Sequence, residues 1–338
     1  MNWKAAGAAI LIVSVCVWAG LTVSATTPPD QRHLRDTYRR PAIPYPSDDP
    51  FSETKAALGR TLFFDPDLSG ARTRSCATCH NPSLSWADGL PRAKGEKTLA
   101  VRTPTLLAIA WIPVLGWDGK FRDLESVAFG PITSPDNMNL HEKVLVERLS
   151  AIPAYANAFS AAFNEGAITR HNIELALATF ERSIVPAEAP FDRWIGGDET
   201  AISAAAKRGF VLFNGKAHCA SCHSGYAFSD GSFHDIGTAQ GRDIGRGRLF
   251  PTSIALQYAF KTPTLRDVAR RAPYMHDGSV ATLSDVIALY DRGGIARPSR
   301  SPLIFPLGLS DGEKSDLLAF LDTLTSPPAT VGLPTLPR

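Results

Sequence analysis

The sequence predicts a mostly α-helical protein that is built from two similar domains. Apolar residues recur at helical spacing, as at Ile173, Leu177 and Phe180, whereas clear alternating strands are scarce. The segments 58–63 and 208–213 are alike, and each ends in Leu-Phe shortly before a Cys-x-x-Cys-His motif. A length of 338 residues also suits two domains.

The expected helices account for most of the regular structure. Helical patterns are expected over 52–64, 141–163, 171–184 and 200–213. Two later helices have capping signals at their starts, Thr282 with Asp285 and Ser310 with Glu313. The regular elements therefore predict a helical rather than a sheet-based fold.

The composition is that of a globular protein with no preference for nucleic acid. Hydrophobic residues make up 44% and charged residues 20% of the chain, which excludes wholesale disorder. A total of 35 Lys and Arg residues against 33 Asp and Glu residues leaves a net charge of +2. This balance gives no electrostatic argument for a nucleic-acid partner.

The two ends of the chain differ from its interior. Lys4 precedes an uncharged apolar stretch, which ends in small residues at Ala25. We expect residues 1–25 to be a signal peptide cut after Ala25, or else an uncleaved anchor, which would place the protein in the periplasm. Residues 26–50 are expected to form a proline-rich leader, and residues 327–338 an extended proline-rich tail.

Two cysteine motifs indicate a covalently bound cofactor. They are Cys76-Ala-Thr-Cys79-His80 and Cys219-Ala-Ser-Cys222-His223. In such a motif each cysteine can form a thioether to a haem vinyl group, and the histidine then binds the iron. A thioredoxin-like pair would need a βαβ context, and a zinc site would not need the adjacent histidines. The motifs therefore predict two haem c groups.

The motifs assign one haem to each domain. We expect an N-terminal haem c domain at 51–190 and a C-terminal one at 191–326, both cytochrome c-like and packed together. No histidine lies between 81 and 140. The iron of the first haem is therefore expected to have an open position for peroxide or another small ligand.

The sequence resembles the bacterial di-haem cytochrome c peroxidases, and especially their MauG-like branch. The matching segments cover roughly residues 50 to 325, in order, and they are 58–65, 68–70, 75–80, 117–119, 130–132, 180–183, 191–193, 262–266, 272–279 and 290–294. The resemblance implies that peroxide is reduced at the first haem. It also implies that the second haem receives electrons from a donor protein.

The resemblance assigns roles to three further residues. Trp117 matches the tryptophan that carries charge between the two haems. Tyr290 matches the distal ligand that the MauG-like branch uses at the second haem, with Met275 as the rival ligand. A phenolate ligand stabilises oxidised iron, whereas a methionine raises the reduction potential.

Several positions depart from the family pattern. Asn137 stands where the family has a distal glutamate, so a proton carrier is missing unless the neighbouring Asp136 replaces it. Val127 replaces a distal glutamine. Arg102 replaces the asparagine of the calcium site, so we expect no calcium. Ala217 replaces a surface tryptophan that a MauG-like oxidation route would use.

These observations predict a periplasmic enzyme that reduces hydrogen peroxide. Its electron donor would be a small c-type cytochrome or a cupredoxin, and the sequence leaves a homodimer open. Two alternatives remain. One is a MauG-like oxidase of a protein or small molecule, and the other is a non-catalytic electron carrier or sensor that has lost the distal glutamate.

Overall fold

The computed structural model describes residues 31–164, 166–328 and 331–337. The expected signal peptide or anchor at 1–25 lies outside these residues. Within this described part of the chain, none of the helices combines the length and the apolar character that a membrane span requires.

Helices are the main regular elements of the described chain. The α-helices are α1 (Gln31–Asp36), α2 (Glu53–Phe64), α3 (Cys76–Cys79), α4 (Leu124–Thr133), α5 (Glu142–Ser150), α6 (Pro153–Ala162), α7 (Arg170–Arg182), α8 (Pro190–Gly196), α9 (Ala204–Asn214), α10 (Leu283–Arg292) and α11 (Asp311–Asp322). Short 3₁₀ helices are η1 (Pro66–Leu68), η2 (Pro82–Leu84), η3 (Ile109–Trp111), η4 (Cys219–Ser221), η5 (Arg246–Arg248), η6 (Ile254–Leu256) and η7 (Val268–Arg270). Strands β1 (Phe233–His234) and β2 (Phe260–Lys261) pair antiparallel. The mostly α fold is confirmed.

The helix boundaries follow local sequence signals. Thr282 and Ser310 accept hydrogen bonds from backbone N–H groups in the first turns of α10 and α11, as their capping patterns predict. The single helix expected over 141–163 is instead two, because Pro153 starts a new helix, α6, just after α5 ends. Helix α4 is not among the expected helices, and it contains Pro131.

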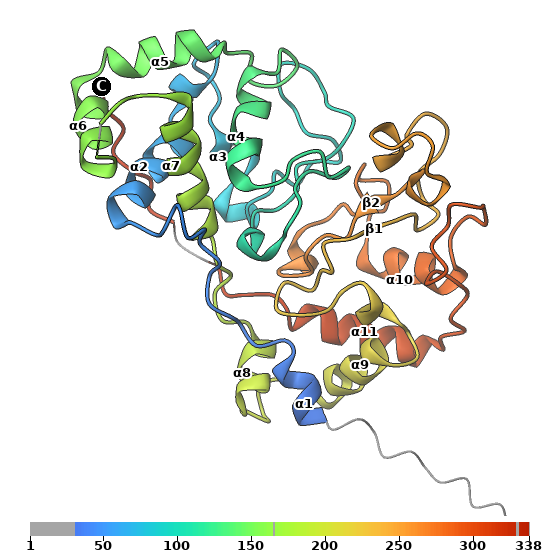
Figure 1. Ribbon diagram of the computed structural model, residues 1–338. Helices are drawn as coiled ribbons and strands as arrows, with labels where there is room; N and C mark the ends of the chain where they lie inside the picture. Colours follow the sequence, from blue (N-terminus) through green and yellow to red (C-terminus); the bar gives the residue numbers. More distant parts are fainter. Residues whose placement is uncertain (1–30, 165, 329–330, 338) are drawn as a thin grey trace, which may run out of the picture.

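The described residues form two lobes, each with its own hydrophobic core (Figure 1). Helices α2 and α4 to α7 make up the first lobe, and α9 to α11 with the two strands belong to the second. The first core includes Phe63 and Phe180, and the second includes Phe210 and Phe320. This separation supports our proposal of one domain at 51–190 and another at 191–326.

The same close helix crossing occurs once in each lobe. A Cβ atom on Gly59 of α2 would lie 1.8 Å from the carbonyl oxygen of Ala176 in α7. A Cβ atom on Gly209 of α9 would lie 2.0 Å from the carbonyl oxygen of Asp316 in α11. Only glycine permits backbones to approach this closely. The α2–α7 and α9–α11 pairs are therefore equivalent, and a cysteine motif follows the first helix of each pair.

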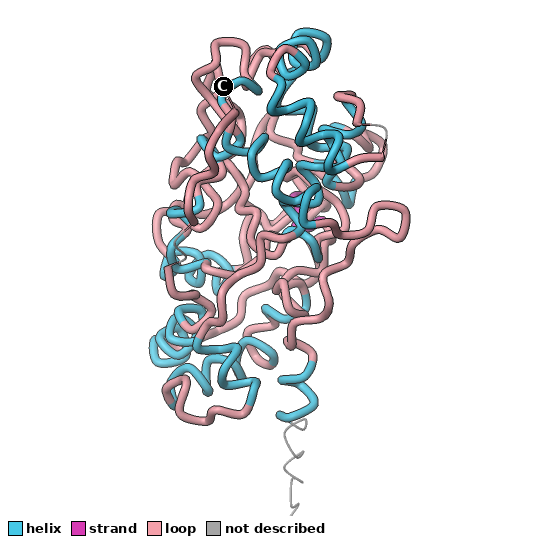
Figure 2. The backbone as a smooth tube through the Cα atoms, turned by 90° about the vertical axis from the view of Figure 1, so that its left-hand side faces the viewer, coloured by secondary structure: helices cyan, strands magenta, loops and turns pink. Residues whose placement is uncertain are grey.

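Loops occupy much of the region between the lobes, whereas helices lie mainly toward the two ends of the molecule (Figure 2). The segment 331–337 returns to the first lobe, where the carbonyl oxygen of Gly332 accepts a hydrogen bond from Arg60 of α2. Within 31–50, Tyr38 is buried in the second core.

We predict that Gly59→Ala destabilises the protein by about 2 kcal/mol, because the added methyl group forces α2 and α7 apart. The matched control is Gly196→Ala at the end of α8, where a Cβ atom would meet nothing within 4 Å. Urea unfolding measures both variants. Equal midpoints for the two would contradict the packing role of Gly59.

Candidate haem sites

The two cysteine motifs adopt closely similar backbone turns. The His80 backbone N–H donates to the Cys76 carbonyl oxygen at 2.9 Å, and His223 donates to Cys219 at the same distance. The turn brings both cysteines and the histidine of each motif to one edge of the cavity described below. Among the described residues, the four cysteines from 76 to 222 form no disulfide, so all are available for thioether bonds.

Both motif histidines are held in the neutral form that can bind a metal. The Nδ1 atom of His80 lies 3.3 Å from the Trp86 carbonyl oxygen, and that of His223 lies 2.8 Å from the Phe228 carbonyl oxygen. A carbonyl only accepts, so Nδ1 carries the proton and Nε2 is left to bind a metal. Burial lowers the pKa of both imidazoles, which favours this neutral form.

The cysteines are poorly suited to thiol redox chemistry. Burial raises the pKa of Cys76 well above its usual range and that of Cys219 to about 12. Reactive cysteines instead have lowered pKa values in partly exposed, electropositive surroundings. The environment therefore disfavours a thioredoxin-like pair.

One continuous cavity of about 660 Å³ connects the two motifs. Its walls include His80 from the first motif and His223 from the second, with Trp117 also on the wall. Most other lining residues are apolar, for example Leu124 and Leu317. The cavity therefore offers an apolar site beside each motif and places the two sites next to each other.

Trp117 is fixed between segments of both lobes. Its indole N–H donates to the Arg102 carbonyl oxygen at 2.9 Å, and its own carbonyl accepts from the Lys261 N–H at 2.9 Å. The Arg102 N–H in turn donates to the His276 carbonyl oxygen at 2.8 Å. The Trp117 and His276 rings meet edge to face, 6.3 Å apart.

Tyr290 and Met275 both line the cavity. Tyr290 comes from α10, and burial raises the pKa of its phenol above the usual range, with smaller contributions from Cys222 and Cys219. These contributions mean that the phenol lies near the second motif. Met275 lies in a loop with a left-handed backbone, at φ 68°. The choice between the two as ligand stays a prediction.

The side chains of Asn137 and Asp136, the two candidates for the distal pocket, point in different directions. Asn137 lines the cavity, as does Val127 of α4. Asp136 instead lies at the surface, where its carboxylate pairs with the Lys97 ammonium at 2.7 Å. Backbone hydrogen bonds from Glu96 to Asn137 and from Lys97 to Asp136, both 3.0 Å long, hold this arrangement.

Buried cations in the cavity wall fit the carboxylate side groups that a haem carries. Burial lowers the pKa of Lys261 to about 8, and its ammonium group has no carboxylate partner among the described residues. The buried Arg271 Nε also lacks a hydrogen-bond partner, and Arg102 lies beside it, donating to its carbonyl oxygen at 3.0 Å. Buried charges are normally paired, so these groups point to anions of the bound cofactor. No sequence motif marked Lys261 or Arg271 for this role.

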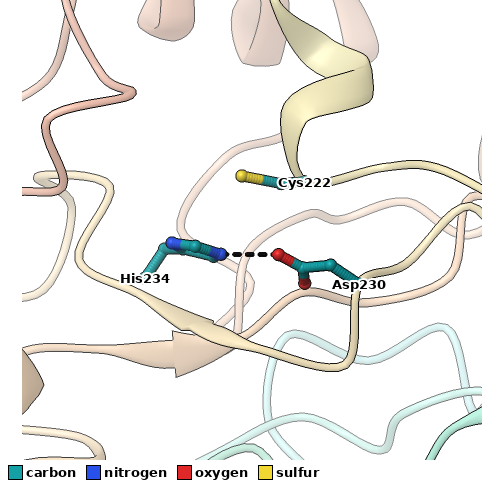
Figure 3. A group of neighbouring side chains, drawn as sticks. All are labelled: Cys222, Asp230 and His234. Carbon is teal, nitrogen blue, oxygen red and sulfur yellow. Dashed lines mark hydrogen bonds and ion pairs between the residues drawn. The ribbon is translucent and has the colours of Figure 1, made fainter.

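A further cluster next to the second motif comprises Cys222, Asp230 and His234 (Figure 3). The His234 Nε2 atom lies 2.8 Å from an Asp230 carboxylate oxygen, and this hydrogen bond raises the pKa of His234 to about 10. Three potential metal ligands lie within 4.8 Å of one another. Because the Cys222 sulfur is required for a thioether, we interpret the cluster as part of the second haem site.

Comparisons with known proteins identify the family. Residues 53–200 match the family model described as di-haem cytochrome c peroxidase. The chain is 33% identical to the cytochrome-c peroxidase IdrP1 of Pseudomonas sp., over 99% of this chain and 97% of that protein. The chain belongs to the di-haem cytochrome c peroxidase family. As a member, it carries two covalently bound c-type haems, in agreement with the two motifs and the cavity.

Two further proteins that are similar to this chain come from the MauG-like branch. The methylamine utilization protein MauG of Methylorubrum extorquens is 49% identical over 330 residues, which are 96% of this chain and 94% of that protein. The crystal structure of a MauG-like protein associated with microbial copper homeostasis has a TM-score of 0.80 at 31% identity, covering 85% of this chain and 93% of that one. The expected two-domain cytochrome c-like fold is thereby confirmed.

We predict two haems per chain that survive acid–acetone extraction, because each motif has both cysteines for thioether bonds to a haem. The double variant Cys219→Ala/Cys222→Ala should keep only one of them. Pyridine haemochrome absorbance against protein concentration gives the ratio. Bound zinc, or a single haem in the unmodified protein, would contradict the assignment.

Proposed function

We propose that this protein is a periplasmic peroxidase that reduces hydrogen peroxide with electrons from a small c-type cytochrome or a cupredoxin. One hydrogen peroxide, two electrons and two protons give two molecules of water. The haems supply an iron site for peroxide and a second electron store. The proposal rests on one observation, the continuous cavity that contains both motifs and Trp117.

The lining of the first pocket includes apolar side chains and the amide of Asn137. His80 is oriented by the hydrogen bond at its Nδ1 atom, and Val127, Pro131 and Asn137 are among the residues that line the wall. The Asn137 amide can donate a hydrogen bond to a bound oxygen, but it cannot release or take up a proton. Peroxide cleavage in this pocket is therefore expected to be slow for the family.

Trp117 is the proposed route for electrons between the two sites. It belongs to the cavity wall, and its indole is held by the Arg102 carbonyl rather than by a flexible side chain. This hydrogen bond restricts rotation of the indole ring. The backbone bond from Lys261 to Trp117 also ties it to β2, which lies in the second lobe.

A MauG-like oxidase is the second candidate, and the 49% identity to MauG favours it. Tyr290 as the proposed ligand of the second haem, in place of Met275, would fit the same branch. Ala217 is buried and offers no aromatic group for a surface route. Electrons from an oxidised substrate would therefore have to reach the cavity by a route that does not use position 217. A non-catalytic carrier or sensor is the alternative if peroxide does not react.

Stopped-flow mixing with peroxide separates these candidates. A peroxidase oxidises its reduced donor continuously as peroxide is consumed. A MauG-like oxidase reacts with peroxide but holds the oxidising equivalents until a substrate is added. A carrier shows no spectral reaction with peroxide in either the ferric or the half-reduced state.

We predict that Asn137→Glu accelerates peroxide cleavage by about 10²-fold, since a carboxyl group can move the proton that an amide cannot. The rate of the spectral change after mixing with peroxide is the measurement. Asn137→Gln is the matched control and should change little, because it adds no titratable group.

Asp136→Asn tests the surface carboxylate next to Asn137 in the sequence. Because Asp136 pairs with Lys97 at the surface, we expect no effect on cleavage. If the unmodified protein already cleaves peroxide as fast as Asn137→Glu does, the proposed deficit at position 137 is wrong.

We also predict that Tyr290→Phe converts the low-spin haem signal to high spin and leaves the other haem unchanged, because the variant removes the proposed oxygen ligand. Electron paramagnetic resonance of the ferric protein provides the readout. If Met275→Ala causes this conversion instead, the ligand is Met275.

A further inference from the structure

Glu181 is a buried carboxyl group that lines the cavity near the first motif. Its side chain is more than nine-tenths buried, and it accepts no hydrogen bond from any described residue. Its charge influences Cys76, which places the carboxyl near the sulfur that attaches the first haem. A buried carboxyl without a donor costs free energy unless it is neutral or has a function.

The second lobe has no such group at the equivalent place. A Cβ atom on Gly59 would contact Ala176 and the Cβ atom of Phe180. A Cβ atom on Gly209 would contact Asp316 and the Cβ atom of Phe320 in the same way. Phe180 and Phe320 are therefore equivalent. The next residues along α7 and α11 are Glu181 and Leu321, and both line the cavity. Where the second site has an apolar side chain, the first has a carboxyl.

The charges around Glu181 leave it without a dedicated counterion. The adjacent Arg182 makes a two-pronged ion pair with Glu125 of α4, at 2.6 and 3.0 Å. Burial raises the pKa of Glu181 to about 8, opposed by Arg182 and reinforced by Glu125. The other titratable group coupled to it is Cys76 of α3, which a thioether removes. Helix α2 and η3 bring no charged side chain that shifts its pKa.

We propose that Glu181 is the proton-exchanging carboxyl of the first haem cavity, which takes up and releases one proton as the charge of that cavity changes. Glu181 would exchange a proton when the first haem is oxidised or reduced, whereas position 137 would stay without a carboxyl for peroxide cleavage. In this respect the inference rests on the proposed function. Helix α4, which packs against α7, carries Val127 and Pro131 of the same pocket.

The direction of the coupling follows from electrostatics. The ferric state puts one more positive charge in the cavity than the ferrous state, and a positive charge favours the ionised carboxylate. Loss of one electron to an external oxidant is thus accompanied by release of one proton from Glu181 to solvent. The first haem's midpoint potential should fall as the pH rises through this titration.

Spectroelectrochemical titration of the full di-haem protein, with redox mediators and at several pH values, tests the inference. One of the two midpoint potentials should fall with rising pH in the unmodified protein. In Glu181→Gln and Glu181→Leu this fall should be smaller over the same range, because the Lys261 ammonium of the cavity wall still titrates there. Glu181→Asp should retain the full fall. A redox difference infrared spectrum should show a neutral carboxyl band that Glu181→Gln lacks.

Glu174→Gln is the matched control on the same helix. Glu174 pairs with Arg170 at 2.8 Å and does not line the cavity, so this variant should keep the pH dependence. An unchanged pH dependence in Glu181→Gln, or no neutral carboxyl band in the unmodified protein, would overturn the inference. A normal Glu181 titration in a protein that does not consume peroxide would support the inference and overturn the proposed peroxidase function.

Discussion

The close contact of two helices in each lobe is the constraint on which the sites depend. At Gly59 and at Gly209 a helix approaches the carbonyl group of its partner more closely than any side chain would allow. This contact sets the direction in which α2 and α9 end, and hence where each cysteine motif begins. The phenylalanines that fill both crossings, Phe180 and Phe320, also form part of the cores beneath the motifs.

Much of this arrangement could be predicted from local sequence patterns. Repeated Leu-Phe helix ends and two Cys-x-x-Cys-His motifs indicate paired haem domains, because both signals are short and contiguous. The sequence predicts that α7 and α11 are helices. It does not predict that they occupy equivalent positions against α2 and α9. This equivalence depends on which carbonyl faces each glycine, and that is a contact between residues more than 100 positions apart in the sequence.

The chemistry of the cavity wall was harder to predict for the same reason. Lys261 and Arg271 lie outside the matching segments, and Glu181 lies in one that assigned it no role. A single sequence does not show which charged residues are buried. Asp136 and Asn137 are neighbours with opposite orientations, and only the contact with 96–97 shows which one lines the cavity. The roles of Trp117, Tyr290 and Met275 remain predictions, although all three lie on that wall.

The chain passes between the lobes more often than a two-domain protein requires. Tyr38 is packed into the second lobe before the chain enters α2 of the first, and residues 331–337 return to the first lobe after α11 ends in the second. Together with the link before α8, three covalent connections tie the lobes together. A hinge motion would have to bend all three at once. The separation of the two haem sites is therefore mechanically constrained, and the electronic coupling between them should remain constant as the protein turns over.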